Sequence, residues 1–145
     1  HPMNGPLILI GVRSQMSSVG KNILTYTQDI MGEAVSLQDR FPMAVFGYAY
    51  LLPLKPPDTG QLDYVRYSRM FAGLTGRGRA TYKQERGRYD HFAFMLVDFE
   101  TDPPTLRTDL IKAIVPEPQL DVETLVDRCV ETFRERNPWL DYFSG

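Results

Sequence analysis

The fold is decided by LILIGVRSQMSS (7–18), the amphipathic segment that runs from there to Phe41, and MAVFGYAYLL (43–52). Residues 7–12 are apolar at successive positions, which is typical of a strand covered on both faces. Ser17 or Ser18 can cap the helix that follows. The apolar residues of that helix recur at helical spacing, and Gln38 falls off their stripe. The stretch therefore predicts two buried strands joined by a long helix.

The rest of the chain continues this alternation. We expect a helix over 61–75, a strand over 91–99, and a last helix that starts after Asp121 as N-cap and ends before Asn137. An apolar i, i+3, i+4 pattern that includes Val126 predicts the buried face of this last helix. Residues 106–115 fit either a short helix or a short strand. The order of elements predicts a single α/β domain, with a mixed sheet of at least three strands flanked by helices.

Length and composition bound the class of protein. The 145 residues suit one domain, and 43% hydrophobic residues is ordinary for a globular protein. We interpret residues 1–5 as a tag scar and leader and residues 6–145 as the domain, which leaves room for a missing upstream domain. Cys129, the single cysteine, lies on an apolar helix face and is expected to be a structural thiol. No apolar run reaches the roughly 20 residues of a membrane span and no signal peptide is recognisable, so we expect a cytoplasmic protein without membrane contact.

Charge is unevenly distributed along the chain. Residues 1–97 carry 11 Lys/Arg against 7 Asp/Glu, whereas residues 98–145 carry 5 against 11. The basic part includes a glycine-bearing loop with two tyrosines and five cations, namely Arg77, Arg79, Lys83, Arg86 and Arg88. Cations interleaved with aromatic rings suit phosphate contact and base stacking, although a solvated loop has the same composition. We therefore take the five cations as candidate nucleic-acid contacts.

Polar side chains follow the first strand. Arg13 and Gln15 lie two apart in an extended segment, so their side chains point to the same side and together can hold a phosphate, a carboxylate or a metal-bound water. Lys21 and Glu33 follow within the predicted helix. The alternative is a structural Arg13–Glu33 ion pair that fixes the strand to the helix.

Several kinds of site are not indicated by the sequence. It holds no glycine-rich phosphate loop, Cys/His zinc spacing, G-x-S-x-G elbow or H-E-x-x-H motif. His91 opens a predicted strand and is interpreted as structural, and Asp90 beside it is interpreted as a turn residue.

The segments IGVRSQMSSVGKN (10–22) and GEAVSLQDRFP (32–42), within this order of elements, resemble the PD-(D/E)XK or restriction-endonuclease-like nuclease superfamily. In that family a central strand carries an acidic-x-lysine signature, and carboxylates hold Mg²⁺. At the matching strand end, Gly11 stands in place of the acid and Arg13 in place of the lysine. The resemblance implies a restriction-endonuclease-like fold and a type II-like endodeoxyribonuclease that uses Mg²⁺ if active.

The resemblance also implies roles for the strand-end residues. Glu33 would be a migrated metal ligand, Gln15 a ligand or water-positioning group, and Arg13 and Lys21 contacts to the scissile phosphate. Two alternatives stay open: the missing carboxylate lies in an upstream part, or the domain is degenerate and only binds DNA.

We predict a DNA-binding domain that hydrolyses phosphodiesters with Mg²⁺ if it is active. A homodimer is compatible with this prediction. The rival prediction is a non-catalytic protein-interaction domain that docks through the acidic C-terminal helix or the WLDYF tail (139–143). A further alternative is a nucleotide-phosphate site at residues 17–21.

Overall fold

A computed structural model describes residues 8–17, 19–41, 44–57, 62–75 and 88–137. Its elements in chain order are β1 (Ile8–Ser14), α1 (Val19–Arg40), β2 (Val45–Pro53), α2 (Tyr64–Gly73), β3 (His91–Asp98), β4 (Thr105–Leu106), α3 (Thr108–Ile114) and α4 (Leu125–Arg136). The strands form one sheet in the order β1-β2-β3-β4. The first three are parallel and β4 is antiparallel to β3. The predicted α/β domain with a mixed sheet is confirmed.

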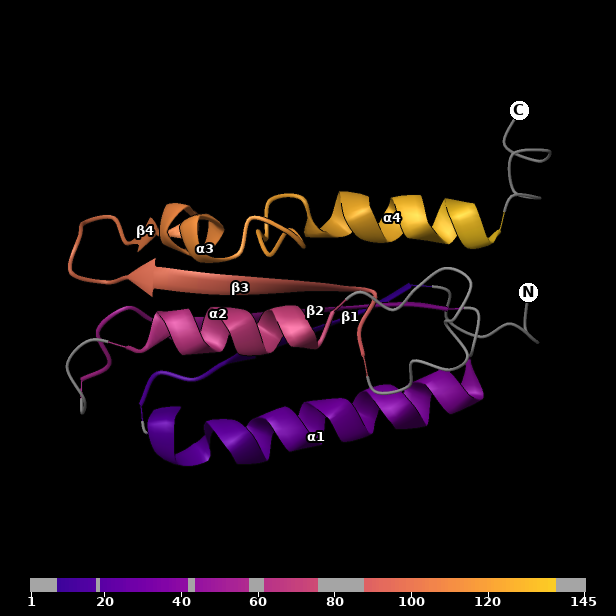
Figure 1. The fold of residues 1–145 in the computed structure, drawn as a ribbon, viewed down its shortest axis with the longest axis horizontal. Helices are drawn as coiled ribbons and strands as arrows, with labels where there is room; N and C mark the ends of the chain where they lie inside the picture. Colours follow the sequence, from indigo (N-terminus) through magenta and orange to yellow (C-terminus); the bar gives the residue numbers. More distant parts are fainter. Residues whose placement is uncertain (1–7, 18, 42–43, 58–61, 76–87, 138–145) are drawn as a thin grey trace.

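The helices cover the sheet from both sides. Figure 1 shows α1 and α2 on one side of the strands and α4 on the other. Both parallel crossovers, β1-α1-β2 and β2-α2-β3, place their helix on the same face, as right-handed connections between neighbouring parallel strands require. Residues 106–115, for which the sequence fitted either a short helix or a short strand, contain both. Leu106 belongs to the short strand β4, and α3 is a short helix that packs against α2 and β3.

The face under α1 and α2 is filled by aromatic rings. Phe71 of α2 lies with its ring centroid 4.9 Å from that of Phe92 and 5.3 Å from that of Tyr50. The ring centroids of Tyr48 and Tyr89 are 5.3 Å apart. Tyr48 and Tyr50 come from alternate positions of β2, Phe92 lies in β3, and Tyr89 precedes β3. All these rings are buried. Large rings fill this side of the sheet, and the hydroxyls of its tyrosines need polar partners there.

The face under α4 is made of small residues instead. A Cβ added to Gly47 would stand 2.8 Å from the sulfur of Cys129, so glycine lets α4 lie close to β2. Ala49, Ala93 and the larger Val45 lie on the same side. Burial raises the pKa of the Cys129 thiol to about 11, which keeps it protonated and confirms the expected structural cysteine.

The start of α4 differs from the prediction. The helix begins at Leu125 with Thr124 as its N-cap residue, and the Asp121 carboxylate accepts hydrogen bonds from the Thr124 backbone N–H and hydroxyl one turn earlier. Val126, expected on the buried face, is exposed. The buried face is narrower than the apolar pattern, because only the side of α4 that faces the small residues of the sheet is covered.

One buried ion pair ties α4 to the start of β3. The guanidinium of Arg136 contacts both carboxylate oxygens of Asp90 and donates to the carbonyl of Ala44 at 3.0 Å. The Phe46 N–H donates to the same carboxylate at 2.8 Å. Both charged side chains are almost wholly buried. Asp90 is therefore a core ion-pair residue, and its interpretation as a turn residue was wrong.

Candidate functional site

The two polar residues at the end of β1, Arg13 and Gln15, lie on the same face of the sheet, as their spacing predicted. Gln15, however, is only 8% exposed. Its Oε1 accepts a hydrogen bond from the Tyr50 hydroxyl at 2.9 Å, and its Nε2 donates to the carbonyl of Ser17 at 3.4 Å. Gln15 thus fixes the turn between β1 and α1 from inside.

Arg13 lies against tyrosine rings between β1 and α1. Its guanidinium carbon is 5.1 Å from the ring centroid of Tyr26 on α1. Burial raises the pKa of Tyr48, and the Arg13 charge, which is within hydrogen-bonding reach of that phenol, opposes the rise. Arg13 itself is half-buried. Its cation is therefore held in place by the ring face of Tyr26 and the phenol of Tyr48, and part of it stays open to solvent.

Gly11 makes this arrangement possible. A Cβ at this position would stand 2.6 Å from Cε2 and 2.7 Å from Cδ2 of the Tyr48 ring. The ring therefore lies directly over the strand where the resemblance leads one to expect an acidic side chain. The space that an acid at this position would need is filled by the tyrosine that supports Arg13.

Glu33 projects from α1 near the same tyrosines. Burial is the main reason that the pKa values of Tyr48 and Tyr89 are raised, and the negative charge of Glu33 raises both further, so Glu33 lies within electrostatic reach of both phenols. Within the described residues no ion pair joins Glu33 to Arg13, so the structural pair considered from the sequence does not form there. That part of the chain also holds no group of three or more His, Cys, Asp or Glu side chains arranged to bind a metal ion.

The remaining predicted residues are only partly described. Lys21 belongs to the first turn of α1, but its side chain lies outside the described residues, as do Arg77, Arg79, Lys83 and Arg86. The two ends of their loop are described. Thr75 bridges to Tyr89, and the carbonyl of Arg88 accepts a hydrogen bond from the Gln38 side chain at 2.6 Å.

Gln38 and Tyr89 were missed as anchors of this loop. Gln38 was placed off the apolar stripe, yet it is buried because its amide reaches the backbone of Arg88. The Tyr89 hydroxyl donates to the carbonyl of Ile30 at 2.9 Å. Both anchors attach the loop to α1.

The sequence prediction also missed the tyrosines of the site. Tyr48 and Tyr50 alternate with Gly47 and Ala49 along β2, and this two-residue period was the available signal that both tyrosines share one face. Burial raises the pKa of Tyr50 to about 12, so its hydroxyl keeps the proton that it donates to Gln15.

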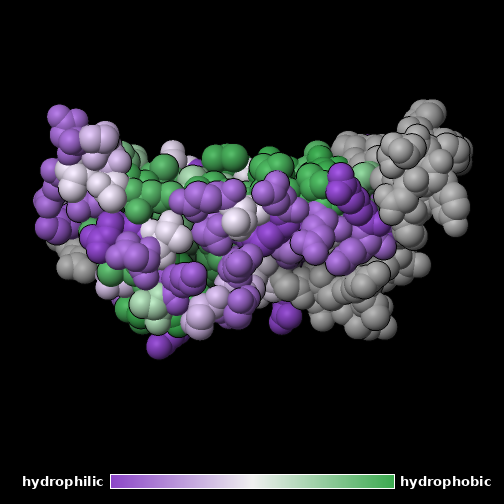
Figure 2. Space-filling view, turned by 90° about the horizontal axis from the view of Figure 1, so that it is seen from above, coloured by the Kyte–Doolittle hydropathy of each residue, from purple (hydrophilic) through white to green (hydrophobic). Residues whose placement is uncertain are grey.

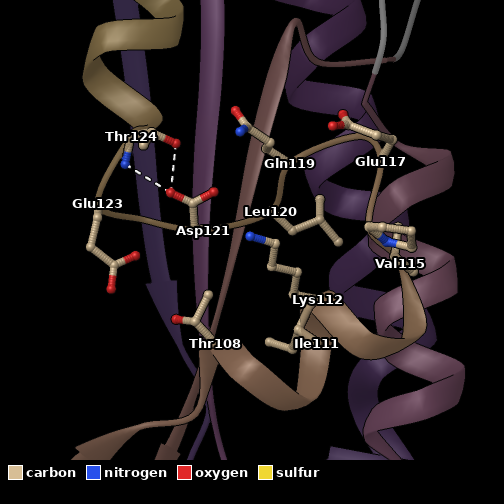
Figure 3. A pocket seen from close by; sticks show the side chains of 11 residues that line it. Thr108, Ile111, Lys112, Val115, Glu117, Gln119, Leu120, Asp121, Glu123 and Thr124 are labelled. Carbon is tan, nitrogen blue, oxygen red and sulfur yellow. Dashed lines mark hydrogen bonds between the residues drawn. The ribbon is translucent and has the colours of Figure 1, made fainter.

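A pocket lies between α3 and the segment 115–124 that leads to α4. It has a volume of about 430 Å³, and Figure 3 shows Lys112 extending across it towards Asp121 above a floor that includes Ile111 and Leu120. Its charged rim is exposed, and none of the predicted site residues lines it. The Arg13 cluster is therefore the candidate site.

A comparison with protein-family models, one with curated proteins and one with solved structures each find no match to this chain. None of the helices in the described ranges combines the length and apolar character needed to cross a bilayer.

Proposed function

We propose that this protein is a restriction-endonuclease-like domain that binds DNA, with Arg13 as a phosphate contact. The observation that carries the proposal is the set of contacts that the Arg13 guanidinium makes. Its guanidinium rests on Tyr26 and near the Tyr48 phenol, and in the described residues no carboxylate pairs with it. An arginine presents five donors in a rigid fork that matches phosphate geometry. Such a cation, oriented and without a carboxylate partner, is suited to an anionic ligand.

The basic loop supports a polymer as that ligand. The Gln38 amide attaches the loop's end at Arg88 to α1. Gln38 lies twelve residues after Tyr26, on whose ring Arg13 rests, which is about 18 Å along a helix axis. The Glu33 charge acts on Tyr48, the same phenol that Arg13 contacts. Arg13 and the base of a loop rich in cations therefore lie along the same helix, so one extended anion has two places to bind.

Magnesium is a weaker fit to the described residues. Glu33 is the carboxylate that acts on this tyrosine cluster, and the ring of Tyr48 fills the space above Gly11. Nucleases of this kind use several carboxylates to hold Mg²⁺, which activates water and stabilises charge on the phosphate. The proposal is therefore binding, and hydrolysis with Glu33 as metal ligand stays a prediction.

The test is fluorescence anisotropy with a labelled DNA duplex over a series of salt concentrations, with and without Mg²⁺. Each phosphate contact contributes about −0.9 to the slope of log K against log salt. We expect Arg13→Ala to make the slope less steep by about one contact. Arg66→Ala is the matched control, because Arg66 also stacks on a tyrosine, 5.9 Å from the Tyr67 ring centroid, but in α2.

The outcomes separate the proposal from its rivals. The proposal is supported if the slope of log K against log salt becomes less steep with Arg13→Ala but not with Arg66→Ala. Equal effects of the two variants, or no binding by the wild type at low salt, would overturn it. A gel run on the Mg²⁺ samples tests hydrolysis separately, with Glu33→Ala as the variant that should abolish any cleavage.

A further inference from the structure

The edge of the sheet at β1 has features of an interface. Within the described residues β1 pairs with β2 alone, and its other side carries no strand. Val12 is 70% exposed and Ile10 is 37% exposed. Figure 2 shows hydrophobic residues in a row along one margin of the α4 side of the molecule. Exposed aliphatic side chains beside an open strand edge are a site for pairing with another strand.

The backbone of β1 is set up for such pairing. The Gln15 N–H donates to the Leu51 carbonyl, so the odd-numbered residues of β1 direct their N–H and C=O groups to β2. The even-numbered residues then direct theirs to the open edge, because the two sets alternate along a strand in a parallel ladder. Ile8, Ile10, Val12 and Ser14 therefore each present a donor and an acceptor at this edge.

Most devices that normally protect an edge strand are missing from β1. The segment ILIGVRS contains no proline and no lysine, and it pairs with β2 in continuous register from Ile8 to Ser14 without a bulge. Its one charged residue, Arg13, turns to the α1 face. Natural sheets protect long apolar edges by proline, lysine or bulges, so an edge that has none of these three, and whose one arginine is on the α1 face, is open to a partner strand.

We infer that this partner is β1 of a second copy of the chain, paired antiparallel about a two-fold axis at Gly11. In that register Ile10 of one copy faces Val12 of the other, twice, and Ile8 faces Ser14, so all seven residues of the strand overlap. Only even-numbered residues form the hydrogen-bonded pairs, which matches the groups that point outwards. Gly11 faces its own copy at the close, non-hydrogen-bonded position. The surface is thus complementary to itself, as a two-fold interface requires.

The result is a continuous eight-stranded sheet with α1 of both copies on one face. This inference does not depend on DNA binding, because it rests on β1 alone.

The first test is sedimentation velocity of the protein from low to high micromolar concentration, without DNA. We expect the wild type to shift from monomer to dimer. Val12→Pro should remain monomeric throughout, because it removes an N–H that points to the open edge and leaves the bonds to β2 intact. Val12→Lys is a second variant, which keeps the backbone N–H of residue 12 and should also remain monomeric. Phe99→Lys is the matched control, since Phe99 is also exposed but follows β3, on the far side of β2, and should leave the dimer constant unchanged.

The second test determines the register. Ile10→Cys protein mixed with Val12→Cys protein should form a disulfide-linked dimer under oxidation, whereas neither variant alone should do so to a similar yield. Hydrogen-bonded antiparallel pairs have Cα atoms about 5.5 Å apart, which suits a disulfide. Cys129 is buried and does not compete. A wild type that stays monomeric, a dimer that survives Val12→Pro and Val12→Lys, or a cross-link in one variant alone would overturn the inference.

Discussion

Two arginines in this molecule have opposite surroundings. Arg136 is enclosed by the Asp90 carboxylate and the carbonyl of Ala44, and both charged side chains are almost wholly buried. Arg13 is half-buried, rests on Tyr26 and reaches the Tyr48 phenol. The same guanidinium thus has a buried counter-charge in one place and aromatic support with open solvent in the other. Burial with a paired charge makes Arg136 a structural residue, whereas the proposed phosphate contact requires an oriented, partly open guanidinium such as that of Arg13.

The largest expected effect is a loss of stability when the buried Arg136–Asp90 ion pair is broken. Arg136→Met leaves the buried Asp90 carboxylate without its counter-charge, which should lower the free energy of unfolding by about 3–5 kcal/mol. Urea denaturation measures this directly. Asp90→Asn added to Arg136→Met should recover part of the loss because the charge is then removed as well. A loss below about 1 kcal/mol for the single variant would mean that the pair contributes little.

The next effect concerns the support of Arg13. Gly11→Ala places a methyl group against the Tyr48 ring, so the ring must move, at a cost of about 1–3 kcal/mol of stability. DNA affinity should fall too, because Tyr48 helps to hold Arg13. Gly32→Ala is the control, since nothing lies within 4 Å of a Cβ there. It should stabilise α1 by about 0.5–1 kcal/mol. Equal thermal unfolding temperatures for the two variants would contradict the role given to Gly11.

A smaller effect is expected from Arg13 itself on stability. Arg13→Ala removes a cation–π contact at a partly exposed position, which is worth about 0.5–1 kcal/mol. Urea denaturation beside Arg136→Met gives the comparison in one experiment. If Arg13→Ala destabilised the fold as much as Arg136→Met, Arg13 would be a structural residue.

The smallest expected effect is the change in stability with pH that comes from His91. His91 opens β3 and its Nε2 lies 2.6 Å from the Thr132 hydroxyl. Burial lowers the pKa of His91, and the charges of Arg128 and Arg136 lower it further, against the opposing charges of Asp90 and Glu135. The unfolded chain therefore binds this proton more readily, so stability should fall as the pH drops below the ordinary histidine pKa of about 6.5.

Denaturation at pH 7.5 and at a mildly acidic pH tests this, with His91→Gln as the variant that should lose this part of the pH dependence. A histidine contribution that stabilised the fold on acidification would contradict the lowered pKa of His91. Since Arg136 contributes to that lowering, Arg136→Met should also weaken the dependence.

The periodicity of the sequence predicted the elements well where one apolar pattern determined the structure. Two apolar runs and an amphipathic segment predicted the positions of β1, α1 and β2. The expectation that the first strand is covered on both faces was wrong, because β1 lies at the edge of the sheet and its Val12 is 70% exposed. The start of α4 was predicted one turn too early, since Asp121 satisfies an N-cap pattern while binding Thr124 before the helix begins.

The candidate site was predicted only in part. The two-residue spacing placed Arg13 and Gln15 on one face correctly, but it did not reveal that the Tyr50 hydroxyl holds Gln15 inside. Long-range pairings such as Asp90 with Arg136 were not visible, because their partners are far apart in sequence and neither carries a local motif. Gln38 was missed for the same reason, since its partner is the backbone of Arg88.

The most direct test of the central claim observes both arginine side chains at once. The Nε–H signals of Arg13 and Arg136 can be assigned by NMR from the single variants Arg13→Lys and Arg136→Met, and then followed while a short DNA duplex is added. We predict that the Arg13 signal shifts saturably with DNA and returns as salt is added, while the Arg136 signal does not move. DNA binding that leaves the Arg13 signal unchanged would contradict the account.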